Sequence, residues 1–115
     1  FHLDSQDVYV KATGGIDVRE PASDLAVCAA VASAVTDRPI PARTVWLGEV
    51  GLGGELRSVP QVTERLTEAA KLGFIKAIVP ANALRGRTAP VGMDVRAVGS
   101  LSEALRAAGL SPGSE

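Results

Sequence analysis

Residues 44–59 read TVWLGEVGLGGELRSV, and this stretch decides the fold. Its first part, Thr44–Val50, is rich in β-branched and apolar residues, which favours a strand. The glycines within 51–54 predict a turn, after which Glu55–Val59 returns as the second strand of a hairpin. A phosphate-binding loop would instead need a helix directly after its glycines. The stretch therefore predicts β-structure near the middle of the chain and no nucleotide site there.

Two helices are predicted on either side of this hairpin. Residues Leu25–Val35, which follow Pro21, are apolar nearly all round. We therefore expect a central helix that is buried on most sides and is the most buried element of the fold. After the hairpin, apolar residues at helical spacing predict an amphipathic helix over Val62–Gly73, which Gly73 would end in a left-handed conformation.

The remaining segments complete an α+β pattern. Alternating or short apolar runs predict strands at 7–13, 76–79 and 93–98. Ser100 and Glu103 form a capping box that begins a last helix, which Gly109 ends. We expect a two-layer arrangement of helices on a mixed sheet, with one domain over residues 1–110 and a flexible tail over 111–115.

Composition excludes several classes of function. The chain has 115 residues, 46% of them hydrophobic, and a net charge of −1. Such a balance is not that of a polybasic nucleic-acid tail. One cysteine and one histidine exclude an internal disulfide and a CxxC-type zinc site, so we predict no metal or cofactor site in this chain. The longest apolar run, Leu25–Val35, is shorter than the about 20 residues of a membrane-spanning helix. We expect a cytoplasmic domain.

Few residues could support catalysis. Cys28 lies on the apolar helix, where a thiol is inert, and His2 is a lone residue near the start of the chain. Ser23 and Asp24 stand at the start of the helix, where they fit local caps or core packing. A nucleophilic Ser23 would need a base, for which the sequence offers lysines at three places, Lys11, Lys71 and Lys76.

Basic residues offer a second kind of site. Arg85 and Arg87 flank Gly86 in a predicted loop, and Lys76 lies upstream. These side chains could contact a phosphate backbone, although a few cations in a neutral domain are more often simply solvated.

Several blocks resemble the RadA (Sms) family of bacterial DNA repair proteins. They are DVYV with Gly14-Gly15, EPASDLA at 20–26, DRPIP at 37–41, GEVGLGGELR at 48–57, EAAKLGF at 68–74 and AIVP at 77–80. The resemblance runs through nearly the whole chain, and the block at 48–57 is its most specific part.

The resemblance implies a fold and a context. In that family the C-terminal domain is similar to the proteolytic domain of Lon proteases, a fold of the ribosomal S5 domain 2 type. An ATPase and a four-cysteine zinc motif precede it, so ATP, magnesium and zinc would belong to those parts. The chain begins at Phe1, and we expect the first helix and strand of the Lon-like unit to lie upstream.

The resemblance also bears on peptidase activity. Lon proteases use a Ser–Lys pair, and alignment with their pattern places the serine position at Ala22 and the lysine position at Thr63. Alanine has no nucleophilic atom, and threonine carries no amine. Ser23 is one residue away, and one residue on a helix turns the side chain by about 100°. No catalytic residue is therefore assigned.

The expected function follows from the resemblance. The chain would be a non-proteolytic Lon-like domain of a DNA repair and recombination protein, serving as a scaffold for a hexameric ring. DNA would be contacted weakly through Arg85 and Arg87 and secondarily through Arg57. Two alternatives stay open: an active Ser–Lys peptidase with Ser23 as nucleophile, and an α/β module that binds a small molecule.

Overall fold

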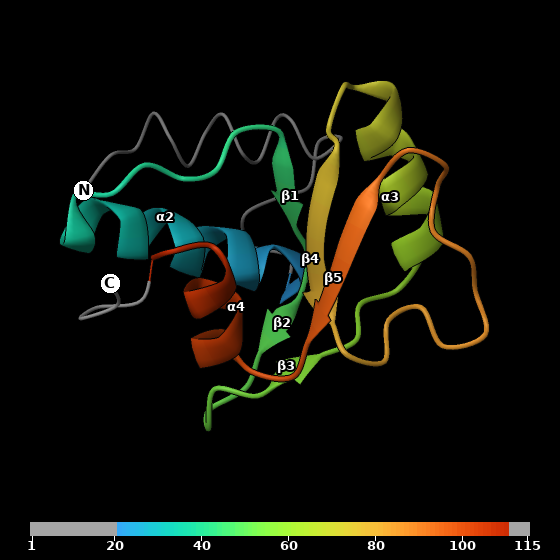
Figure 1. The fold of residues 1–115 in the computed structure, drawn as a ribbon. Helices are drawn as coiled ribbons and strands as arrows, with labels where there is room; N and C mark the ends of the chain where they lie inside the picture. The colour runs from blue at the N-terminus through green and yellow to red at the C-terminus, as the bar shows by residue number, and fades with distance from the viewer. Residues whose placement is uncertain (1–20, 111–115) are drawn as a thin grey trace.

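A computed structural model describes residues 21–110 of the chain (Figure 1). The short helix η1 leads directly into α2, the strands β1 to β3 follow, and helix α3 precedes the remaining strands and the last helix. The bounds are η1 Pro21–Ser23, α2 Asp24–Thr36, β1 Thr44–Trp46, β2 Glu49–Val50, β3 Leu56–Arg57, α3 Val62–Lys71, β4 Lys76–Pro80, β5 Asp94–Val98 and α4 Leu101–Ala107. The strand predicted at 7–13 and the tail predicted at 111–115 lie outside the described residues.

The larger sheet of the described residues is parallel. Its strand order is β1-β4-β5, with Thr44 opposite Lys76 and Lys76 opposite Asp94. Antiparallel pairing occurs in a separate two-stranded sheet, in which Glu49 of β2 faces Arg57 of β3. The predicted hairpin is confirmed. The predicted mixed sheet is not found among these residues, because the hairpin strands leave the main sheet instead of joining it.

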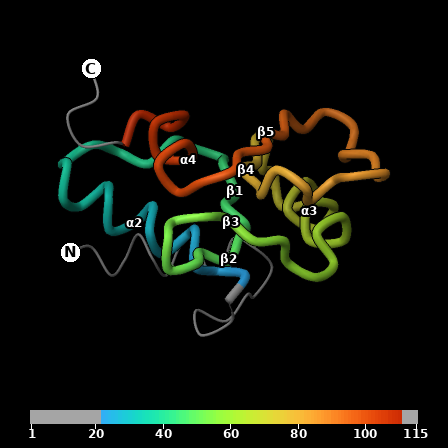
Figure 2. Tube along the Cα trace, turned by 90° about the horizontal axis from the view of Figure 1, so that it is seen from below, coloured from blue at the N-terminus to red at the C-terminus, as the bar shows by residue number. Residues whose placement is uncertain are grey.

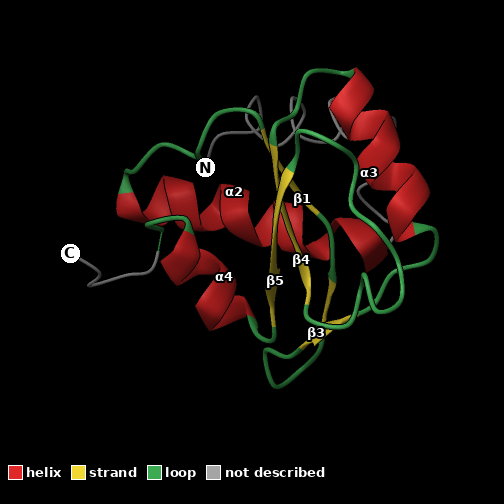
Figure 3. Cartoon of the chain, turned by 45° about the vertical axis from the view of Figure 1, so that its right-hand side comes forward, coloured by secondary structure: helices red, strands yellow, loops and turns green. Residues whose placement is uncertain are grey.

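Helices cover both faces of the parallel sheet (Figures 2 and 3). On β4, Ala77 and Val79 pack with the cluster that contains Leu66 of α3. Ile78 between them packs with the cluster that contains Leu25 of α2 and Ala104 of α4. Successive residues of a strand point to opposite faces, so β1 and β4 carry buried residues on both faces, whereas β5 is fully buried only at Val98. The two-layer prediction is therefore wrong, since the sheet lies between two helical layers.

Helix α2 is present as predicted, but it is buried along one side only. Leu25, Ala26, Ala29 and Ala30 are buried, and their small side chains allow a close approach to the sheet. On the other side Val31 is 40% exposed and Val35 is 73% exposed. The strands β1 and β4 are more completely buried than this helix. The apolar sequence of α2 therefore led to a wrong prediction that the helix is buried on most sides.

The predicted strand Thr44–Val50 is divided in two. Its first three residues, which form β1, belong to the parallel sheet, and its last two, which form β2, belong to the hairpin. The interruption is at Leu47 and Gly48. Gly48 donates from its backbone N–H to the carbonyl of Ala22 at 3.0 Å and accepts from the N–H of Leu25 at 3.0 Å. These bonds to the start of α2 replace sheet pairing.

The predicted ends of the other helices are confirmed in most details. Gly73 follows α3 with a φ of +99°, which glycine adopts without strain. Ser100 Oγ accepts from the N–H of Glu103 at 3.1 Å, as in a capping box. The Glu103 carboxylate, however, accepts from the N–H of Gly99 at 3.0 Å, one residue before the expected donor.

The two sides of α2 generate a prediction. Ala29→Asp places a charge where the side chain is 1% exposed, and should reduce the free energy of unfolding by about 3 kcal/mol or more. Val31→Asp changes a surface position and should cost less than about 1 kcal/mol. Chemical denaturation of both variants measures the difference. Equal losses would contradict the one-sided packing of α2.

Candidate functional site

The position aligned with a catalytic serine is enclosed. Ala22 belongs to η1 and is 2% exposed. Its carbonyl accepts from Gly48, so it lies just past the carboxyl end of β1. The methyl group belongs to the same apolar cluster as Leu47, Val59 and Val62. The carboxyl ends of parallel strands are where ligands bind in most α/β folds, and here that place is filled by hydrocarbon.

The position aligned with a catalytic lysine lies at the same edge of the sheet. Thr63 is in the first turn of α3, next to Val62, which shares the apolar cluster with Ala22. The Thr63 hydroxyl is buried and makes no hydrogen bond to the described residues. Ala22 is part of this apolar cluster, and Thr63 follows Val62, which also belongs to it. They supply neither a serine nor an ammonium group.

Ser23 and Asp24 are not the local caps that their position predicted. Ser23 is 2% exposed, and its side chain makes no capping bond to α2. The Asp24 carboxylate instead accepts from the backbone N–H of Val50 at 3.1 Å and so ties α2 to the hairpin.

The described lysines lie at the opposite edge of the sheet from Ser23. Lys71 ends α3 and Lys76 begins β4, whereas Ser23 adjoins the carboxyl end of β1. The five residues of β4 span about 13 Å between those two edges. A Ser–Lys pair of Ser23 with Lys71 or Lys76 is therefore disfavoured by the geometry.

Cys28 behaves as a structural residue. It lies partly buried on α2, and burial, together with the nearby negative charge of Asp24, raises the pKa of its thiol above the usual 9.0. A raised pKa lowers the thiolate fraction and hence the reactivity.

Within residues 21–110, no three acidic, cysteine or histidine side chains come close enough to hold a metal ion. No helix in the same range is long and apolar enough to cross a membrane.

Arg57 is exposed but is paired with acids. Its guanidinium lies 2.9 Å from the Glu55 carboxylate and 4.0 Å from that of Glu49. Glu55 hydrogen bonds to Arg57, which raises the pKa of the guanidinium further. The pairing joins Glu55, just before β3, to Arg57 in β3, and it was not predicted from the sequence.

The Glu55 carboxylate also organises the hairpin turn. Besides Arg57, it accepts from the backbone N–H of Gly53 at 3.1 Å. A Cβ on Gly51 would meet the Glu55 carboxylate, the far end of a flexible side chain, which would then have to shift. The turn therefore serves a structural purpose.

Arg85 and Arg87 keep their charges available. Both are exposed, and Arg85 donates to the neutral amide oxygen of Asn82 at 3.0 Å. They stand on either side of Gly86, whose φ is +71°. The segment after β4 and the hairpin strand β3 lie at the same edge of the sheet (Figure 1). Of the three predicted DNA-contact residues, Arg57 is the one whose charge is offset by neighbouring acids.

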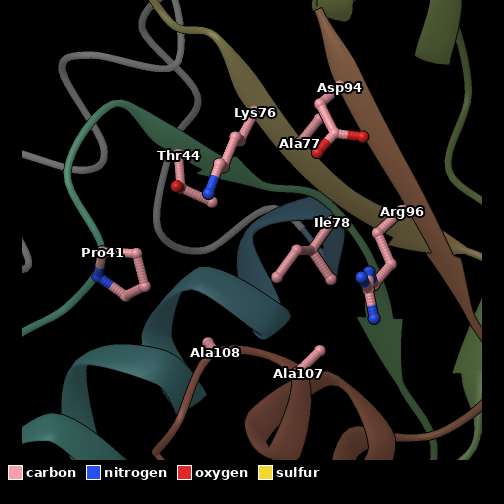
Figure 4. A pocket seen from close by; sticks show the side chains of 9 residues that line it. All are labelled: Pro41, Thr44, Lys76, Ala77, Ile78, Asp94, Arg96, Ala107 and Ala108. Carbon is pink, nitrogen blue, oxygen red and sulfur yellow. The ribbon is translucent and has the colours of Figure 1, made fainter.

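A small pocket lies at the other edge, where the strands begin (Figure 4). Its volume is about 100 Å³, and its lining comes from the loop before β1, from the three strands of the parallel sheet and from the end of α4. The lining residues are Pro41, Thr44, Lys76, Ala77, Ile78, Asp94, Arg96, Ala107 and Ala108. This pocket was not predicted from the sequence, because four separate segments of the chain assemble it. The alternation of charged and apolar residues on β4 and β5 was the available signal.

Comparisons with known proteins find one matching family and several similar proteins. The family described as Subunit ChlI of Mg-chelatase matches residues 4–83. The DNA repair protein RadA of Escherichia coli K12 is 51% identical over 105 residues, which is 91% of this chain and 23% of that protein. RadA of Bacillus subtilis 168 is 46% identical over 104 residues, 90% of this chain and 23% of that protein. The chain spans about a quarter of the length of such relatives.

The hairpin geometry generates a pH prediction. Backbone and Arg57 hydrogen bonds lower the pKa of Glu55 below its usual 4.5. A group whose pKa is lowered in the folded state adds stability above its unfolded pKa and loses it as the pH falls through the folded pKa. Glu55→Gln should therefore destabilise the protein near pH 7 and converge with the wild type below pH 4.5. Denaturation curves across this range check it, and a difference that grows toward low pH would refute it.

Proposed function

The chain belongs to the family described as Subunit ChlI of Mg-chelatase. We propose that it is a non-proteolytic, Lon-like domain of a DNA repair protein. The RadA relatives support the repair context, since they match nine-tenths of the chain. The domain acts as a scaffold in a larger assembly and contributes a weak contact to DNA.

One observation carries the non-proteolytic part of the proposal. Ala22 and Thr63 occupy the aligned catalytic positions at one edge of the sheet, and the space around Ala22 is packed with Leu47, Val59 and Val62. A serine nucleophile needs a nearby base and room for a peptide carbonyl. The packed apolar cluster provides neither, so the edge is suited to holding elements together.

An active Ser–Lys peptidase is the alternative that this geometry favours less. Ser23 is 2% exposed, which would keep a polypeptide substrate from its hydroxyl. Lys71 and Lys76 lie at the far edge of the sheet. Peptidase activity would therefore require both a different base and a rearranged helix start.

The wider role rests on the relatives and not on this chain alone. The glycines at 51–54 join the two strands of a hairpin and do not lead into a helix, as a phosphate-binding loop would. We place nucleotide and zinc chemistry in other segments of the parent protein, a cytoplasmic ATPase that acts on DNA during recombinational repair. Identical domains in a closed ring would contact each other head to tail, most simply as a hexamer.

The DNA contact is proposed at the edge that carries Arg85 and Arg87. Arg57 contributes less, because Glu55 and Glu49 offset its charge. A net charge of −1 gives the domain no strong attractive field for DNA. A single domain should therefore bind weakly, whereas repeated domains in a ring gain affinity through their effective concentration.

Peptidase activity is directly testable. The chain should neither degrade unfolded casein nor react with a fluorophosphonate probe, since Ala22 offers no nucleophile and Ser23 is enclosed. Mass spectrometry of the probe-treated protein, with Ser23→Ala as the matched control, is the measurement. Labelling of Ser23 that the control lacks would reverse the proposal in favour of the peptidase.

DNA binding is tested by fluorescence anisotropy across a salt series. The isolated chain should bind duplex DNA weakly, and an oligomeric parent protein should bind tightly and lose affinity in Arg85→Ala/Arg87→Ala. Each lost phosphate contact should reduce the salt slope by about 1. Arg106→Ala, an exposed arginine on α4, is the control. Tight, salt-resistant binding by the isolated chain would contradict this account, as would an unaffected double variant.

A further inference from the structure

The sheet face toward α2 and α4 is covered over only part of its length. On this face, Trp46, Ile78 and Val98 pack with residues of α2 and α4. Two residues before each of them on the same face are Thr44, Lys76 and Arg96, of which Thr44 and Lys76 lie side by side at the strand starts and Arg96 lies opposite Ile78. Because alternate residues of a strand share a face, these polar groups adjoin the apolar core. The pocket of about 100 Å³ forms where the helical cover ends.

The side chains around this pocket converge from three strands (Figure 4). The ammonium of Lys76 points toward Thr44 and Pro41, and the guanidinium of Arg96 extends past Ile78 toward Ala107. Lys76 and Arg96 thus flank Ile78, which forms the floor.

The charged side chains that line the pocket carry a net charge of +1. Lys76 and Arg96 are two cations, and Asp94, opposite Lys76 in the sheet register, is one anion. Figure 4 shows the Asp94 carboxylate directed away from the Lys76 ammonium, so the cations are not closed off by it. The Thr44 hydroxyl donates to the carbonyl of Ala42 at 3.1 Å.

The rest of the lining is apolar. The methyl groups of Ala107 and Ala108 come from the carboxyl end of α4, where free carbonyls would repel an anion. The carbonyls of Leu105 and Arg106 already accept from the N–H groups of Leu110 and Gly109, at 2.8 and 3.1 Å. These alanines therefore offer mainly hydrocarbon to a ligand.

We propose that this pocket binds a small monocarboxylate with a short aliphatic chain. The carboxylate would pair with Arg96 and Lys76, because a guanidinium donates two parallel hydrogen bonds to a carboxylate. The aliphatic chain would lie on Ile78 and the two alanines. A net lining charge of +1 matches a single negative charge better than a phosphate dianion. The volume corresponds to about three water molecules, which limits the ligand to a few carbon atoms.

The site is tested by NMR titration of the chain with butyrate, observed through the methyl groups of isoleucine. Ile78 in the floor should shift with a saturating curve and a Kd of about 1 mM or weaker. Ile75, which does not line the pocket, should shift little. Lys76→Gln and Arg96→Gln should each weaken binding about tenfold. Lys71→Gln removes an exposed lysine outside the pocket and should leave the affinity unchanged.

Two comparison ligands keep the assignment falsifiable. Butylammonium carries the same chain with the opposite charge and should not compete with butyrate, and inorganic phosphate should bind more weakly. Absence of a saturating Ile78 shift would overturn the proposal, as would equal shifts with butylammonium or tighter binding of phosphate. In each variant, unchanged resonances of residues outside the pocket show that the variant remains folded. None of these outcomes depends on DNA binding or on peptidase activity.

Discussion

The structure depends on the paired backbone hydrogen bonds between Gly48 and the start of α2. Gly48 donates to Ala22 and accepts from Leu25, both at 3.0 Å, just after the chain has left strand β1 of the parallel sheet. A Cβ at Gly48 would already lie 3.5 Å from Pro80 and 3.6 Å from Leu25, so the chain segments are in close contact. This junction fixes η1 at the carboxyl end of the sheet, directs the chain into the hairpin and sets the apolar surroundings of Ala22.

The two edges of the sheet consequently differ in chemistry. At the carboxyl edge, where α/β folds commonly bind ligands, Ala22 and Val62 close the space with hydrocarbon. At the amino edge, Lys76 and Arg96 are left beside an open pocket because α4 ends before it covers them. The fold thus closes the edge where ligands commonly bind and leaves charged groups accessible at the opposite edge.

The sequence predicted the local elements better than their assembly. The hairpin, α3 and its glycine end, and the Ser100 cap depend on neighbouring residues, and they were found. Periodicity carries no information about which face of a sheet a helix covers, so the three-layer packing was missed. For α2 the all-apolar pattern concealed the exposed Val35. The aligned positions Ala22 and Thr63 rest on the family resemblance, whereas the pocket needed the fold.

The most direct test of the account is the accessibility of position 22. In a Cys28→Ser background, a cysteine placed by Ala22→Cys should react with a maleimide at least about a hundredfold more slowly than one placed by Leu52→Cys, because enclosed positions react only through opening. Leu52 is fully exposed at the hairpin turn and serves as the reference. Comparable rates at both positions would show an open cleft at the carboxyl edge and contradict the closed, non-catalytic junction.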